Sequence, residues 1–388
     1  MDALSAGVDD ALPVDWTSER AREVDAIMRL QCIPGVGTRT LWRVLERFGS
    51  GVAALEASSA QLNAAAGSKA AASLRASGLK ERVDDAMQRC IRSGMRVLTW
   101  RDPQDPVRML HLADPPPLLF GQGDIRLLSR PAVTVVGSRR STPYGRRVAE
   151  RLAAELSRHG VLVVSGLALG IDGAAHRGAL EAGGDTIAVL GSGVDLIQPS
   201  THRALGQRIA REGLLLSEFL PGEPAQAYHF PCRNRILAAL GGAVVVVEAA
   251  ARSGAFITVE HALDIGRDVY AVPGPVDSLQ SRGSNDLLRQ GARVVVSVAD
   301  FVRDLDLSGA DPTTSKSSQS AGARAGEPRR LTPVVRRVWS ALNERPLRVE
   351  EFARAARLES SNVLAVLTEL ELSGWVLREA GIRFRKAS

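Results

Sequence analysis

Short uninterrupted runs of apolar, mostly β-branched residues alternate with helix-length amphipathic stretches through the middle of this chain. Apolar runs without polar alternation are typical of strands that are buried on both faces of a sheet. Helix-length segments between such strands predict right-handed crossovers and a mostly parallel sheet. The expected strands are Val133–Val136, Val161–Val164, Thr186–Leu190, Leu214–Leu216, Val244–Val247, Val269–Val272 and Val294–Val296. The pattern therefore predicts a Rossmann-like α/β domain, with a lead-in, over residues 98–307.

The segments on either side of this domain have a different pattern. Residues 1–21 are polar and are expected to form a loose tail, whereas residues 22–97 hold short helical segments rich in Ala, Leu and Arg. Residues 308–330 have the composition of a flexible linker. Residues 331–388 follow the order helix, helix, helix, hairpin, with good capping residues from Ser360 at the start of the third helix. This order predicts a C-terminal winged helix.

Residues 33–38, with the sequence Ile-Pro-Gly-Val-Gly-Thr, lie between two helical stretches of the N-terminal region. They resemble a helix–hairpin–helix, whose glycine-rich turn offers backbone amides to a phosphate. Residues 64–69 resemble a degenerate second copy. A SAM-like helical fold that serves only in packing or partner contact explains the same pattern, and the sequence leaves both interpretations open.

The third helix expected in the winged helix is acidic. Asn362–Ser373 has no basic residue and includes Glu369 and Glu371. A helix that enters a DNA groove is expected to be basic, because it must lie against phosphates. We therefore expect this domain to contact protein, or to bind through the basic hairpin at residues 383–386, and we disfavour a transcription factor that reads duplex DNA.

Charge and cysteine usage narrow the class of protein. A formal net charge of +6 permits a polyanionic partner, but arginine abundance also follows from genomic base composition. The three cysteines are too few and too scattered for a disulfide framework, and none has the paired spacing of a zinc site. No apolar run is long enough for a membrane span, and the acidic N-terminus is unlike a secretory signal. We expect a cytoplasmic protein without a metal or cofactor.

The first expected strand runs into Gly137, Ser138, Arg139 and Arg140 and then opens a helix. Such a turn is where α/β proteins hold phosphate, because glycine lets backbone amides approach the anion and the helix N-terminus adds partial positive charge. The spacing is neither GxGxxG nor a P-loop, which favours a backbone phosphate over a dinucleotide. An ordinary tight turn with exposed arginines is the competing interpretation.

Small residues also follow the next two expected strands, at Ser165 and Gly166 and again at Gly191. Because the carboxyl ends of parallel strands line one crevice, we expect these positions to join the same site. Asp172 and His176 lie four residues apart at the start of the next helix. Since no nucleophile or metal-ligand partner accompanies them, they are interpreted as a structural pair that fixes the helix to its loop.

Phe230 comes directly before a cluster of Arg233, Asn234 and Arg235, near a helix start expected at Pro231. Two arginines there repel the helix dipole unless an anion is close. An aromatic ring beside cations is the pairing of single-strand binders, in which bases stack while cations hold phosphates. Phe230 as a core residue and the arginines as surface charge are the alternatives.

Together these segments resemble the DprA (Smf) family of DNA-processing proteins. The resemblance rests on the order of SGLALGID, TIAVLGSGVD, SEF.PG, HFP.RNRI, VVVVEA...SG..IT and GRDVYAVPG across residues 118–299. It implies sequence-independent binding of single-stranded DNA, protection of the strand from nucleases, and loading of RecA in natural transformation and recombination. By the resemblance, residues 137–139, Phe230 and residues 233–235 match the family's DNA-contact positions. Departures from the family pattern occur at residues 198–200, His202 and Asp105, and the first removes one expected phosphate contact.

A nucleotide hydrolase similar to the lysine-decarboxylase-like phosphoribohydrolases is the main rival. Residues 252–260 take the place of its PGGxGTxxE loop, but only Gly254 and Glu260 match and Phe256 replaces a glycine. That interpretation leaves the other segments unexplained. We therefore expect a binding protein and not an enzyme, and we assign no catalytic residue.

The last part of the α/β domain, residues 285–302, combines an amphipathic helix with an apolar β run. As the final strand of the sheet it is a candidate edge, which must be covered or paired. We expect a homodimer through this segment, with Asn285, Leu288 and Val296 at the interface, as the resemblance to the DprA family also implies. Cover by the N-terminal helical region is the alternative.

Overall fold

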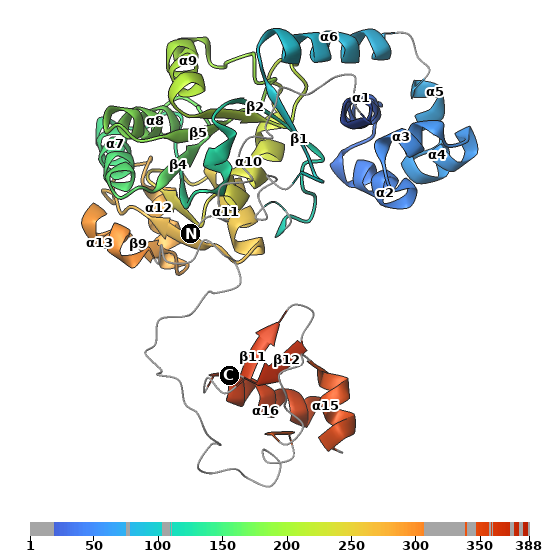
Figure 1. Cartoon of the computed structure of the whole chain (residues 1–388). Coiled ribbons are helices and arrows are strands. Elements are labelled where there is room, and N and C mark those ends of the chain that lie inside the picture. Colours follow the sequence, from blue (N-terminus) through green and yellow to red (C-terminus); the bar gives the residue numbers. More distant parts are fainter. Residues whose placement is uncertain are drawn as a thin grey trace, which may run out of the picture. The chain divides into compact units, whose positions relative to one another are not determined.

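A computed structural model describes residues 19–74, 78–102, 109, 111–305, 338–339, 347–356, 358, 360–372, 376–379 and 383–386. The expected tail up to residue 18, the expected linker 308–330 and Asp105 lie outside these residues. The chain divides into two compact units, residues 1–312 and 313–388, and each is described by itself. The first unit holds an N-terminal helical region and a large α/β domain (Figure 1).

A nine-stranded sheet forms the centre of the α/β domain, with the order β1-β2-β6-β5-β4-β3-β7-β8-β9. Its strands are β1 (Arg96–Thr99), β2 (Leu118–Gly123), β3 (Ala132–Val136), β4 (Leu162–Ser165), β5 (Thr186–Val189), β6 (Leu214–Ser217), β7 (Ala243–Val246), β8 (Asp268–Ala271) and β9 (Arg293–Val294). The β1–β2 and β2–β6 pairs are antiparallel, and the other neighbours are parallel. The mostly parallel Rossmann-like sheet is confirmed. The expected run Val294–Val296 shortens to a two-residue strand, and β1 and β2 were not expected.

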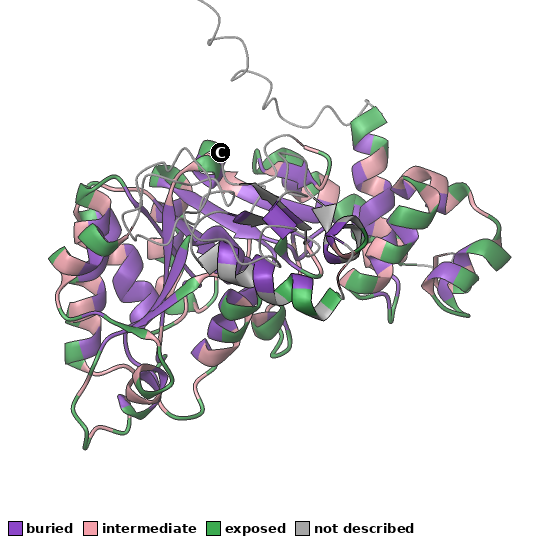
Figure 2. Cartoon of the chain, turned by 90° about the horizontal axis from the view of Figure 1, so that it is seen from below, coloured by how far each residue is buried: buried purple, intermediate pink, exposed green. Residues whose placement is uncertain are grey.

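Helices cover both faces of this sheet, which explains the continuous apolar runs of its strands. One face carries α7 (Pro143–Arg158), α8 (Ile171–Glu181), α9 (Arg203–Glu212) and α13 (Val298–Asp304), and the other carries α10 (His229–Leu240), α11 (Ala255–Asp264) and α12 (Arg282–Arg289). Within β3, Val133 and Val135 pack toward α7 and α8, whereas Val136 packs toward α10 and α11. Figure 2 shows the strands buried between helices whose outer surfaces are exposed.

The N-terminal region consists of α1 (Glu19–Gln31), α2 (Thr38–Phe48), α3 (Gly51–Glu56), α4 (Ser59–Ala66), α5 (Ala70–Leu74) and α6 (Leu79–Arg92). Gly35 turns the chain between α1 and α2 at a φ of 82°, and Gly67 does so between α4 and α5 at 110°. The apolar core of this region continues into β2 and β6, and the Trp42 indole donates to the carbonyl of Pro115 at 2.5 Å. The region therefore packs at the β1–β2 end of the sheet, away from β9 (Figure 1), so the alternative that it covers the β9 edge is wrong.

The second unit contains α15 (Val349–Ala356), α16 (Ser360–Leu372) and a small antiparallel sheet of β10 (Leu347–Arg348), β12 (Arg383–Lys386) and β11 (Val376–Glu379), in that order. Phe352, Leu367 and Phe384 lie in its apolar core. The C-terminal winged helix is confirmed. Within the described segments of the whole chain, every helix falls short of the length and hydropathy that a membrane crossing needs.

Candidate nucleic-acid interface

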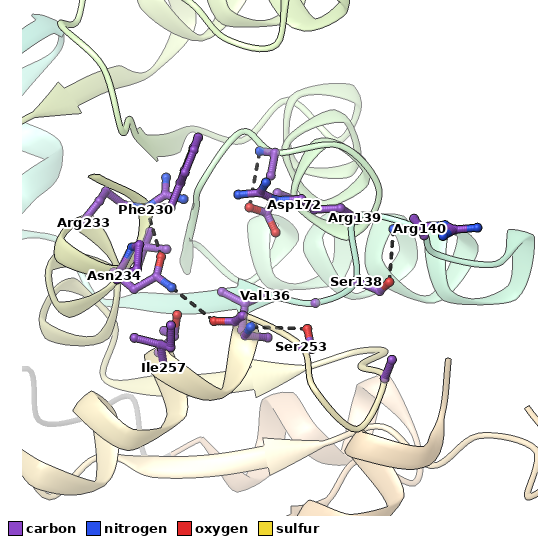
Figure 3. A pocket seen from close by; sticks show the side chains of 18 of the residues that line it. Val136, Ser138, Arg139, Arg140, Asp172, Phe230, Arg233, Asn234, Ser253 and Ile257 are labelled. Carbon is purple, nitrogen blue, oxygen red and sulfur yellow. Dashed lines mark hydrogen bonds between the residues drawn. The ribbon is translucent and has the colours of Figure 1, made fainter. Parts of the chain in front are cut away.

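A pocket of about 630 Å³ opens at the carboxyl ends of the central strands. Its walls come from the β3–α7, β4–α8, β7–α11 and β8–α12 loops and from the start of α10 (Figure 3). The side chains and backbone that line it include Gly137, Ser138, Arg139, Arg140, Asp172, Phe230, Arg233, Asn234, Ser253 and Gln280. The structure thus brings the predicted loop 137–140 together with Phe230, Arg233 and Asn234. Ser165, Gly166, Gly191 and Arg235, which were also predicted, do not line the pocket.

The buried carboxylate of Glu248 shapes the loop that carries the two arginines. It accepts hydrogen bonds from the Thr142 backbone amide and from the Thr142 hydroxyl, both at 2.7 Å, at the start of α7. The Ser138 amide donates to the Glu248 carbonyl at 2.6 Å. A Cβ on Gly137 would lie 2.7 Å from that same carbonyl, so only glycine fits there. These contacts fix the loop, and Arg139 and Arg140 leave it in opposite directions (Figure 3).

Phe230 and Arg139 form the mouth of the pocket. The Arg139 guanidinium lies 4.5 Å from the centre of the Phe230 ring, which is within the range of a cation–π contact. The ring is half-buried and lines the pocket, so Phe230 is not a plain core residue. A Cβ on Gly191 would lie 3.1 Å from the ring, so this glycine makes room for Phe230 from behind.

Arg233 lies in the floor of the pocket and is buried. Its guanidinium donates to the carbonyls of Gly166, at 2.9 Å, and of Val189. Burial lowers the pKa of Arg233 to about 10, while Asp172 acts in the opposite direction and Arg139 in the same one. A Cβ on Gly166 would lie 2.5 Å from this guanidinium, so Gly166 contributes to the site by admitting Arg233.

The comparisons with known proteins agree with this geometry. A family model described as DNA recombination-mediator protein A matches residues 96–306, and a model of the DprA winged helix domain matches residues 322–381. This chain belongs to the DprA (Smf) family. Protein Smf of Synechocystis is 35% identical over 321 residues, which cover 74% of this chain and 79% of that protein. DNA processing protein DprA of Streptococcus pneumoniae is 43% identical over 201 residues, which cover 52% of this chain and 71% of that protein.

Solved structures of DprA proteins are also similar. The X-ray structure of DprA from Streptococcus pneumoniae matches with a TM-score of 0.64 and 35% identity, over 73% of this chain and 97% of that chain. A structure that describes the single-stranded DNA binding mode of DprA from Helicobacter pylori matches with a TM-score of 0.50 and 32% identity, over 53% of this chain and 94% of that chain. Both matches combine a similar fold with a sequence identity above 30%, so they support the fold and the family together.

Arg235 has a different position from the one expected of a DNA contact in a DprA protein. Its guanidinium makes two hydrogen bonds of 2.6 Å to the buried carboxylate of Glu218 and a third, of 3.0 Å, to the Asp114 carbonyl. Burial opposes the charge, but Glu218 prevails and the pKa of Arg235 is raised. The anion that was expected near the arginines at the start of α10 is thus, for Arg235, the Glu218 carboxylate of the chain itself. This geometry gives Arg235 a structural role.

Asp172, Ser253 and Gln280 line the pocket although the sequence did not place them in a site, and Asp172 was expected only to pair with His176. The Asp172 carboxylate lines the pocket and accepts from the Ala168 amide at 3.4 Å, which ties α8 to the preceding loop. Burial raises the pKa of Asp172, and the nearby Arg233 partly offsets this shift. The expected pairing with His176 is not formed, because the His176 ring bonds to the Thr186 hydroxyl at 2.8 Å. Burial lowers the pKa of His176 to about 3, so that ring is neutral at physiological pH.

Proposed function

We propose that this protein binds single-stranded DNA at the pocket without reading its base sequence. The observation that carries the proposal is the Arg139 guanidinium held 4.5 Å from the half-buried ring of Phe230 at the mouth of the pocket. A flat aromatic face accepts any base, and a neighbouring arginine holds the phosphate backbone. Arg140 and the buried Arg233 add positive charge, against the single carboxylate of Asp172 in the lining. The Helicobacter pylori relative, described as binding single-stranded DNA, supports the same conclusion.

The proposal is tested by fluorescence anisotropy with labelled oligonucleotides. We expect tight binding to single strands of mixed, purine-rich and pyrimidine-rich composition, with affinities within about tenfold of one another, because stacking is tolerant of sequence. Duplexes of the same sequences are expected to bind more weakly, because their bases are already stacked and cannot reach Phe230. A strong preference for one base, or equal binding of duplex, would contradict the proposal.

Replacement of Arg139 by alanine is expected to weaken binding to every single strand alike. Each phosphate that a protein neutralises on a single strand adds about 0.7 to the slope of log affinity against log salt. The Arg139→Ala variant should therefore lose about that much of the slope. Arg126→Ala is the matched control, because Arg126 is exposed, pairs with Asp124 and lies outside the pocket. An unchanged slope in a folded Arg139→Ala protein would remove Arg139 from the DNA path.

We further propose that the bound strand is protected from nucleases and passed to RecA in the cytoplasm, during natural transformation and DNA recombination. The family membership supports this role, since its relatives are named for DNA processing. The test is RecA filament formation on single strands coated with a single-strand binding protein, followed by ATP hydrolysis. Wild-type protein should shorten the lag before RecA begins to hydrolyse ATP, whereas with Arg139→Ala the lag should stay as long as without the protein.

We also propose that the protein is a homodimer through the β9 edge, with Asn285, Leu288 and Val296 at or near the interface. Among the strands that the structure describes, β9 pairs with β8 alone, and Val296 is 78% exposed. Leu288 is partly packed against the core, and the Asn285 amide already bonds to Gly274 at 3.0 and 3.1 Å. An exposed, apolar edge is stabilised by pairing with a second edge.

Light scattering at micromolar concentration tests this dimer. Wild type is expected at twice the single-chain mass of 41.3 kDa, and Val296→Arg at the single-chain mass, because a charge at an apolar interface is costly. Val296→Arg is preferred to Leu288→Arg, since Leu288 also contributes to the core. A monomeric wild type would end the proposal. A dimer that Val296→Arg leaves intact would place the interface elsewhere.

A further inference from the structure

The outer face of α7 carries an aromatic ring and two arginines in one line. Tyr144, Arg147 and Arg151 are three and then four residues apart, which places them on the same side of an α-helix. Arg147 and Arg151 are exposed, and Tyr144 is 40% exposed. The Tyr144 hydroxyl donates to the carbonyl of Pro273 at 3.2 Å, so the ring is held in place beside the pocket's β8–α12 loop.

These two arginines have no acidic partner among the described residues. Some arginines of other helices do, as with Arg208 and Glu212 on α9 at 2.9 Å, or Arg289 and Asp286 on α12 at 3.3 Å. An arginine without a carboxylate leaves its full charge available to a polyanion.

The carboxylates of α7 itself are occupied by other cations. Glu150 lies 3.7 Å from Arg177, and Glu155 lies 2.7 Å from Arg158. The positive charge of the outer face is therefore not cancelled by the acidic residues of the same helix.

This line of residues follows the pocket's β3–α7 loop directly in the chain. Arg140 lines the pocket but points away from Phe230, on the side opposite to Arg139 (Figure 3). Tyr144 follows four residues later, in the first turn of α7. From the start of α7 to Arg151 the helix rises about 12 Å, at 1.5 Å per residue. That length matches about three or four stacked nucleotides.

We propose that a single strand leaving the pocket over Arg140 continues along α7, with a base against Tyr144 and phosphates on Arg147 and Arg151. This inference rests on the proposed function, because it extends the same DNA path. Because the contacts proposed are one stacking face and two phosphate contacts, the extension adds affinity and site length and not sequence preference.

The test compares Arg147→Ala/Arg151→Ala with wild type on oligothymidylates of about 6 and about 25 nucleotides, lengths chosen to fill the pocket alone or the pocket and the helix. On the long strand we expect the salt slope to fall by about 1.4 and the affinity to fall about tenfold at 0.15 M salt. On the short strand the double variant should match wild type. Arg139→Ala should weaken both lengths.

Two further variants control for charge. Arg208→Ala/Arg211→Ala removes the same two positive charges from α9, away from the proposed path, and should leave both lengths unaffected. Arg147→Lys/Arg151→Lys keeps the charges and should restore most of the long-strand affinity. Thermal melting checks that all variants are folded, which we expect because the altered side chains are exposed or lie on a helix surface.

The outcomes separate the two proposals. If wild type binds neither length, the proposed function fails and the α7 path fails with it. If wild type binds the long strand more tightly but Arg147→Ala/Arg151→Ala behaves like the α9 control, only the α7 path is overturned. A length-dependent loss confined to the α7 variant supports both.

Discussion

Glu218→Ala is expected to lower the free energy of unfolding by about 3–5 kcal/mol, the largest effect among these predictions. The Glu218 and Arg235 side chains are 7% and 4% exposed, and they are joined by two hydrogen bonds of 2.6 Å. Removal of the carboxylate leaves a buried guanidinium whose remaining carboxylate contact is Asp114, at 3.4 Å. Urea denaturation followed by circular dichroism measures the change, with an unchanged m-value as the check on two-state behaviour.

Two companion variants make this prediction specific to the buried pair. Arg126→Ala breaks an exposed pair with Asp124 and should leave the free energy of unfolding nearly unchanged. Combining Glu218→Leu with Arg235→Met should recover much of the lost stability, because apolar replacement of a buried pair is often neutral. A loss below about 1 kcal/mol for Glu218→Ala would mean that Arg235 finds another partner, and its role as a structural residue would be withdrawn.

Phe230→Ala is expected to weaken single-strand binding by about 1–3 kcal/mol, as alanine substitution does at base-stacking positions. The ring is half-buried, lines the pocket and lies against Arg139, so its loss removes both a stacking face and a support for that guanidinium. Phe230→Trp should bind as well as wild type, because stacking needs only a flat face. Anisotropy titrations with oligothymidylate measure the effect.

Thermal melting distinguishes this role from one in the core. Since Phe230 is not fully buried, Phe230→Ala should lower the melting temperature far less than truncation of the buried Phe120. A large drop in melting temperature with unchanged affinity would assign Phe230 to the core and refute base stacking.

The arginines that were predicted to contact DNA differ in their surroundings. Arg139 and Arg140 are exposed at the mouth of the pocket, whereas Arg233 is buried in its floor and is neutralised in part by carbonyls and by Asp172. Arg235, two residues further along α10, belongs to an internal ion pair. We therefore expect salt-dependent phosphate binding to come mainly from Arg139 and Arg140 of the β3–α7 loop. The two arginines of α10 are expected to stabilise the neighbouring loops.

Local patterns in the sequence were sufficient for the fold class and for the end of the sheet at which the pocket opens. Continuous apolar runs indicate strands that are covered on both faces, and small residues after Val136, Val164 and Val189 mark the sheet edge where the pocket opens. These signals are periodic or adjacent in the chain, so they can be recognised without knowing what packs against them. The strands β1 and β2 were not recognised, because they precede the alternation of strands and helices and the antiparallel pairing of β2 depends on β6, a strand far away in sequence.

The role of each charged side chain was decided only by the tertiary structure. Arg233 and Arg235 look alike in the sequence, yet the first meets the Gly166 carbonyl, 67 residues away, and the second meets Glu218, 17 residues away. Asp172 lies in the pocket because α8 begins beside the Arg139 loop. Whether a charge is exposed, paired or desolvated depends on groups brought together through space, and the cost of burying it is set by those partners. The sequence therefore determined which loops form the pocket, and only the packing of distant segments decided which of their arginines remain exposed and which are buried.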